Sequence, residues 1–183
     1  MVQRTVVSVR LAPLLLGAAL ACNRGTETVG PSFAASANAP VHSITGGGKV
    51  DVTSRFPGFD ESTISLTASV DGNGVAQGQL KATFSIPFEE KVHMELSCLA
   101  VDGNEAWIGG TVTKSHPNGT WLGRVFIVRF QDNGKGKDSP PDRMSHFRAD
   151  AGLGPDRCLN KPIPANGEFD LHFPYVKGNI VIR

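Results

Sequence analysis

The chain has 183 residues, 18 basic and 17 acidic, which give a formal net charge of +1. This near balance argues against general nucleic-acid binding, which needs a basic face, and against a polybasic segment for binding membrane surfaces.

The first 21 residues have the pattern of a secretory signal peptide. Arg4 and Arg10 are the only charged residues before Cys22, and the apolar run of residues 11–21 follows them. Eleven helical residues rise only about 16 Å, roughly half of a bilayer core, so a transmembrane helix is the less favoured interpretation. We expect residues 1–21 to be removed, which leaves 16 basic and 17 acidic residues and a net charge of −1.

Cys22 is the expected attachment site for a lipid. Residues 19–21 (Ala-Leu-Ala) fit a general signal peptidase, and together with Cys22 they resemble the lipobox of bacterial lipoproteins, with Leu one place nearer the Cys than usual. The chain has three cysteines, and a lipid on Cys22 leaves Cys98 and Cys158 as an even pair. We therefore expect an exported protein of the bacterial cell envelope, anchored to a membrane through Cys22. The outer membrane is favoured if the cell has one, because Asn23 and not Asp follows.

The remaining chain is expected to be a tether and one domain. Small and polar residues dominate residues 22–42, where no period is visible, so the lipidated Cys and these residues are interpreted as a flexible tether. Residues 43–183 have a suitable length for a single domain, which at this size buries about two-thirds of its unfolded surface.

The domain is predicted to be all-β. In residues 62–70 and 78–86 apolar residues alternate strictly with polar ones, as in half-buried antiparallel strands. The same alternation places five residues on one face: Val92, Met94, Leu96, Cys98 and Ala100. Eight or nine strands are expected, at about 43–52, 62–70, 76–86, 91–101, 105–114, 121–131, 142–149, 168–175 and 178–183.

Short turns connect most of these strands. Residues 71–74, 102–103 and 116–119 contain the Asp-Gly and Asn-Gly pairs that tight hairpins need. Strands joined in this way lie side by side, so we expect a single antiparallel meander. It would bury its apolar faces either as a closed barrel or as a two-sheet sandwich, and the sequence does not separate the two.

Two long segments interrupt the strands: residues 132–142, rich in Gly, Lys and Pro, and residues 151–167. Loops of this length in a compact domain are often functional or mobile. Cys158 lies in the second loop and Cys98 on a predicted strand, in a compartment where disulfides persist. We therefore predict a Cys98–Cys158 disulfide that holds the second loop against the core.

Several motifs occur in an order that resembles a known group of domains. They are Gly46-Gly47-Gly48, Lys91-Val-His93, residues 98–110, residues 130–138 and Gly178-Asn179-Ile180. Over about residues 44–183 they resemble small glycine-rich β-domains of secreted bacterial proteins, found beside choice-of-anchor domains. The insert with Cys158 and the lysines at 135 and 137 depart from that group. The resemblance implies an exported all-β protein and, because the group has no assigned activity, no catalytic residue.

Two groups of residues have side chains that could bind a metal. Residues 132–138 offer carboxylate oxygens for calcium, but the first, third and fifth positions of an EF-hand loop would be Asp132, Gly134 and Gly136, so a solvated loop is the better interpretation. His93 and Glu95 are expected on one face, where an acid–base pair or a metal site that includes His146 or His172 would be conceivable. Two polar residues on a solvent-facing surface are the more usual case.

The sequence offers no other chemistry. It has no nucleophile elbow or paired-histidine zinc motif, and the three glycines at 46–48 precede no phosphate-binding helix, which favours an entry turn or a bulge. Trp107 and Trp121 are better interpreted as core residues than as a sugar-stacking platform.

We therefore expect a non-catalytic binding or structural module without cofactor or metal, whose partner is an envelope polysaccharide or a protein and not nucleic acid. A small-molecule carrier with an apolar pocket in a barrel is the alternative, and an uncharacterised enzyme comes third.

Overall fold

The structure, a computed structural model, describes residues 39–53, 61–85, 89–136, 138–149, 154–162 and 169–183. The predicted signal peptide, Cys22 and the tether as far as residue 38 lie outside the described residues. Within the described part of the chain, no helix is long and apolar enough to cross a membrane.

The described residues form nine strands and one 3₁₀ helix, η1, which confirms the all-β prediction. The strands are β1 (Pro40–Val50), β2 (Ser62–Asp71), β3 (Ala76–Phe84), β4 (Glu90–Asp102), β5 (Glu105–His116), β6 (Val125–Gln131), β7 (Arg143–Met144), β8 (Arg148–Ala149) and β9 (Phe173–Ile182). The helix η1 (Pro155–Asn160) lies in the second predicted loop.

Several predicted boundaries differ from the structure. The predicted strand 142–149 is wrong, because the chain forms two strands of two residues each there, β7 and β8, separated by residues 145–147. β1 begins at Pro40, three residues before the expected start of the domain. The predicted strand 121–131 begins only at Val125, because residues 120–123 form a turn. The segments 168–175 and 178–183 contribute to one strand, β9, whose Gly178 adopts a φ of 105° inside the strand and not at a connecting turn.

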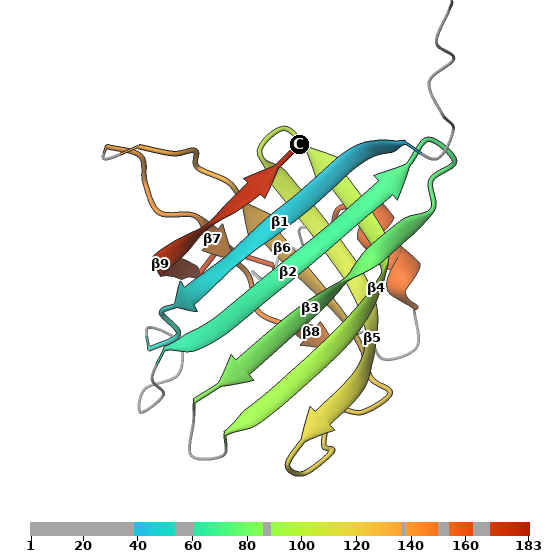
Figure 1. Cartoon of the computed structure of the whole chain (residues 1–183), viewed down its shortest axis with the longest axis vertical. Coiled ribbons are helices and arrows are strands. Elements are labelled where there is room, and N and C mark those ends of the chain that lie inside the picture. The colour runs from blue at the N-terminus through green and yellow to red at the C-terminus, as the bar shows by residue number, and fades with distance from the viewer. Residues whose placement is uncertain (1–38, 54–60, 86–88, 137, 150–153, 163–168) are drawn as a thin grey trace, which may run out of the picture. The chain divides into compact units, whose positions relative to one another are not determined.

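The strands pair through a closed ring of antiparallel ladders (Figure 1). β1 to β6 pair in chain order; β6 then pairs with β7, β7 with β9, and β9 with β1. β8 pairs with β6 as well. This closure makes a barrel the better description of the two architectures that the sequence left open.

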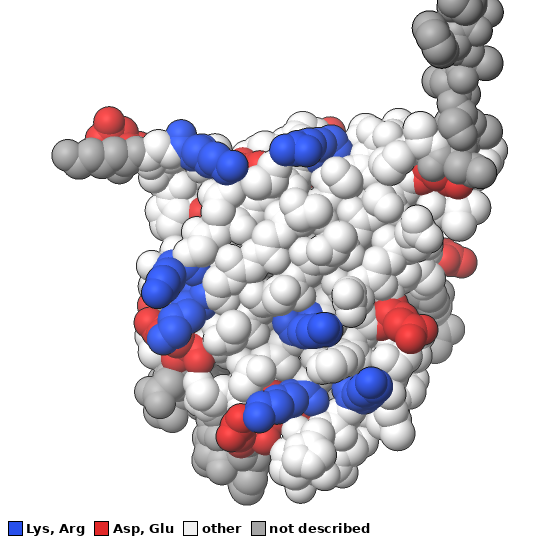
Figure 2. All heavy atoms as spheres, viewed as in Figure 1, with Lys and Arg blue, Asp and Glu red and all other residues white. Residues whose placement is uncertain are grey.

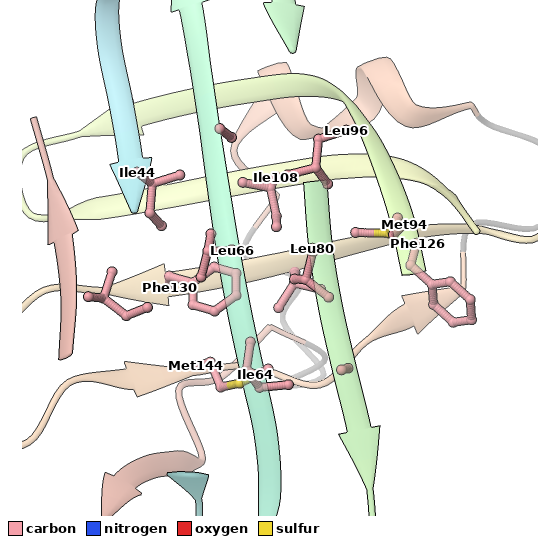
Figure 3. Close-up of a cluster of buried hydrophobic side chains, with 14 of the residues drawn as sticks. Ile44, Ile64, Leu66, Leu80, Met94, Leu96, Ile108, Phe126, Phe130 and Met144 are labelled. Atoms are coloured by element: carbon pink, nitrogen blue, oxygen red, sulfur yellow. The ribbon is translucent and has the colours of Figure 1, made fainter. Parts of the chain in front are cut away.

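Apolar side chains from all around the ring fill its interior (Figure 3). Ile44, Leu80 and Phe130, from β1, β3 and β6, are completely buried, so they meet at the centre from strands far apart in the sequence. This interior follows from the alternation of the sequence, since every second residue of β2 and β3 points inward.

β4 does not keep one face throughout its length. Leu96 pairs with Gly110 and Cys98 with the adjacent Gly109, so Ser97 is an extra residue, a β-bulge. After the bulge Leu99 packs inside the barrel, whereas Cys98 faces the outside. The prediction that Leu96, Cys98 and Ala100 share a face is therefore wrong, because the extra residue reverses the alternation.

The reversal creates a second, smaller core on the outside of the barrel. It comprises Cys98, Ala100, Trp107, Ile127, Cys158 and Phe169. The predicted Cys98–Cys158 disulfide is present, with 6.1 Å between the Cα atoms. It attaches η1 to β4, so the described part of the second long segment, residues 154–162, is held against the barrel as predicted.

The glycine run of β1 lies inside the strand and not in an entry turn. β1 pairs with β2 on one side and with β9 on the other, and Gly48 stands opposite Gly178. A Cβ atom at Gly48 would overlap the carbonyl oxygen of Lys177, and one at Gly178 would overlap that of Gly47. Glycine is therefore required for the close approach of β1 and β9.

Candidate binding surfaces

The first candidate is a hollow of about 310 Å³ between the 134–142 segment and β9, which we call the loop groove. Its lining residues are Gly134, Lys135, Gly136, Ser139, Pro140, Pro141, Asp142, Tyr175, Gly178 and Asn179. It lies outside the filled interior and is open to solvent. Its wall is the first of the two long loops noted in the sequence.

Two aspartates hold this loop against β9. The carboxylate of Asp142, only 4% exposed, accepts hydrogen bonds from the backbone N–H of Ile180 at 2.6 Å and of Asn133 at 2.8 Å. The carboxylate of Asp132 accepts the backbone N–H of Ile182 at 3.0 Å. These bonds continue the closure of the barrel beyond the two residue pairs that join β7 to β9.

The same bonds bear on the calcium interpretation of residues 132–138. One carboxylate oxygen of Asp132 accepts the N–H of Ile182 and the other accepts the N–H of Gly134 at 2.8 Å. The described residues contain no group of three or more His, Cys, Asp or Glu side chains that could hold a metal ion. Asp132 therefore has a structural role in fixing the loop.

Tyr175 forms part of the loop groove and is 5% exposed. Its hydroxyl group is buried and has no hydrogen-bond partner among the described residues. Burial raises the pKa of the Tyr175 hydroxyl well above its usual range, and the charge of Asp142 raises it further. The phenol is therefore neutral at physiological pH and keeps its proton available for donation.

The second candidate is a line of basic side chains on the outer surface, which we call the basic row: Lys81, His93 and Lys114. Lys81 stands directly opposite His93, and His93 directly opposite Lys114, so the row crosses β3, β4 and β5. Figure 2 shows basic side chains over the lower part of this face, with acidic ones at its margins. Within the described residues, no ion pair neutralises Lys81 or Lys114.

A hollow of about 350 Å³ adjoins the basic row, and we call it the end groove. It is lined by Glu89, Lys91, His116, Pro117 and Asn118. Lys91 and His116 are cross-strand partners two residues along β4 and β5 from the row. Lys91 forms an ion pair with Glu89 at 3.0 Å, and both side chains are more than half exposed, so this pair neutralises little.

The four residues considered for a metal site do not come together. His93 and Glu95 share the outer face of β4 as expected, but His93 lies between Lys81 and Lys114 in the ladder. The rings of His146 and His172 instead lie against each other near β9, with centroids 5.9 Å apart. Folding therefore separates the pair on β4 from the pair near β9.

The two tryptophans contribute to the packing of the domain. Trp107 is 2% exposed in the outer core, where its indole N–H donates to the carbonyl of Pro162 at 3.3 Å and the guanidinium of Arg129 lies 5.3 Å from its ring centre. Trp121 is partly buried and stacks on Phe126 with 5.1 Å between ring centroids. Neither ring offers a free face of the kind that stacks on a sugar.

The loop groove and the basic row could be predicted only in part from the sequence. It singled out residues 132–142 as a long loop, but the contribution of β9 to the loop groove could not be read from the sequence. The basic row depends on the register of three strands. No family model matches the chain, and searches among curated proteins and solved structures found no match.

Proposed function

We propose that this chain is an exported, lipid-anchored protein of the bacterial cell envelope, whose β-barrel is a non-catalytic binding module. The main support for a binding module is the position of the loop groove. The barrel interior is occupied by its own side chains, whereas the groove is open to solvent on the outside. A small-molecule carrier would need its apolar space in the interior, so this arrangement supports the module over the carrier.

The composition of the groove supports a sugar as its ligand. Pro140, Pro141 and Tyr175 provide apolar surface, while Lys135 and Asn179 provide hydrogen-bonding groups at its edge. A sugar ring also combines apolar and hydrogen-bonding surface, with C–H groups on its faces and hydroxyl groups around its rim. The groove volume of about 310 Å³ is at the lower end of the range for ligand sites. We infer that it holds one or two units of a neutral envelope polysaccharide.

The binding half of the proposal is tested with the full chain carrying Cys22→Ser. Titration with neutral oligosaccharides and peptidoglycan fragments is expected to give saturable binding. Lys135→Ala combined with Asn179→Ala should weaken that binding by about tenfold, since two hydrogen bonds at about 0.7 kcal/mol each are lost. Lys177→Ala, an exposed position of β9 outside the groove, should leave the affinity unchanged. Saturable binding of small apolar ligands instead would favour the carrier.

The anchoring half is tested by the change Cys22→Ser in the exporting cell. The variant is expected to lose its membrane association, because the only proposed attachment is a lipid on that thiol. Detergent phase partitioning and membrane fractionation measure this directly, with the wild-type chain as the reference. If the Cys22→Ser protein partitions into detergent as the wild type does, the lipid-anchor proposal is wrong.

A further inference from the structure

The basic row places two lysines on the outer surface without a described partner. Lys81 and Lys114 lie two strands apart, on either side of His93, and no ion pair among the described residues involves either of them. The nearest carboxylate on the same strand, that of Glu95, belongs to the next cross-strand row, between Gln79 and Thr111. The fold therefore contains no described partner that neutralises the row.

We propose that the basic row is a docking surface for an acidic polysaccharide of the uronate type, with one carboxylate on each sugar. Adjacent strands lie about 4.8 Å apart, which is close to the length of one sugar in an extended chain. Lys81 and Lys114 then present ammonium groups to carboxylates two sugars apart, and the imidazole of His93 between them offers a hydrogen-bonding group. This surface involves none of the residues of the loop groove, so it stands independently of the function proposed above.

The form of the row favours a linear polymer over a membrane surface. On one side of the basic row the adjacent row, Gln79, Glu95 and Thr111, is neutral or acidic. On the other side Lys91 adds one charge, which is paired with Glu89, so the lysines form a narrow band and not a broad plane. The end groove beside the line, with Lys91 and His116 in its wall, provides a concave surface for a continuing chain. A flat layer of lipid headgroups would not enter it.

The row also lacks what single-stranded nucleic acids require. Proteins that bind them combine a positive groove with aromatic side chains on which bases stack. The described row contains two lysines and a histidine, and the rows on either side of it, Gln79-Glu95-Thr111 and Thr83-Lys91-His116, contain no Phe, Tyr or Trp. A linear polymer that carries carboxylates therefore fits the basic row better than a single-stranded nucleic acid does.

The test uses the full chain carrying Cys22→Ser, titrated with polygalacturonate and with neutral dextran. Lys81→Gln combined with Lys114→Gln is expected to weaken polygalacturonate binding by about tenfold, since two charge contacts at about 0.7 kcal/mol each are lost. The matched control, Lys177→Gln in β9 combined with Arg183→Gln directly after it, removes the same charge and should change the affinity by less than about twofold. Binding should also weaken as salt is added.

Anionic phospholipid vesicles and a single-stranded oligonucleotide complete the experiment. Binding to either of them more tightly than to polygalacturonate overturns the choice of a polyuronate. If the row variant and the β9 control lose affinity equally, binding depends on net charge alone and the basic row is not a docking surface. The proposal is also wrong if polygalacturonate shows no saturable binding. The row variant should unfold at about the same temperature as the parent, because surface substitutions of this kind usually change stability by less than about 0.5 kcal/mol.

Discussion

Replacing Cys98 and Cys158 together by Ala is expected to lower the free energy of unfolding by roughly 4 kcal/mol. The disulfide closes a loop across a sequence separation of 60 residues, and in the chain-entropy model a loop of this size corresponds to about 4 kcal/mol. The expected loss is a large fraction of the stability of an ordinary domain, about 5–15 kcal/mol. Urea unfolding of protein recovered from an exporting host measures it.

The structural consequence should be concentrated in the outer core. Without the disulfide, η1 loses its covalent link to β4, so hydrogen exchange should accelerate in residues 154–162 before it does in the barrel. Leu159→Ala is the matched control: Leu159 follows Cys158 in η1 but is 59% exposed, so its loss should cost less than about 0.5 kcal/mol. A double cysteine variant as stable as the parent would contradict the prediction.

Raising the pH above 10 is expected to destabilise the protein, and Tyr175→Phe should remove much of that effect. Burial and the charge of Asp142 raise the pKa of Tyr175 in the folded state, whereas the unfolded chain ionises at about 10. Below pH 10 both states keep the proton, and the residue contributes no pH dependence. Above it only the unfolded state gives up its proton, so stability falls by about 1.4 kcal/mol for each pH unit until the folded state also ionises.

The chain contains a single tyrosine, so tyrosinate absorbance reports on Tyr175 alone. We expect this absorbance to appear only with unfolding, as followed by circular dichroism in the same titration. Tyr175→Phe keeps the ring and removes a hydroxyl without a hydrogen-bond partner, so at neutral pH it should be at least as stable as the parent. Reversible ionisation near pH 10 in a protein that remains folded would show that the hydroxyl is accessible.

The alternation of apolar and polar residues determined most of the strands, because the side-chain period of a strand is a local property. In β2 the residues Ile64, Leu66 and Ala68 are buried and their neighbours Thr63 and Ser65 are exposed, as the pattern predicts. The count of cysteines outside the expected signal and lipid site predicted the disulfide, since only one pairing remained. Neither inference required knowledge of contacts between distant strands.

Only the tertiary structure decided the faces of β4 and the closure of the ring. The bulge at Ser97 depends on how β4 meets β5, and nothing in the local pattern marks it as an extra residue. The carboxylates of Asp132 and Asp142 receive backbone N–H groups of Ile182 and Ile180, which are 50 and 38 residues away in sequence. A local sequence window contains only one partner of each bond.

The loop groove and the basic row also depend on contacts between residues that are far apart in the sequence. A net charge of +1, or −1 without the expected signal, describes a whole chain and predicts no concentration of charge. Lys81, His93 and Lys114 become neighbours because two antiparallel ladders bring them into register. The sequence by itself determined most of the strands and, β4 apart, their polar faces. The tertiary structure decided which polar residues stand together, because register is set by pairing between strands.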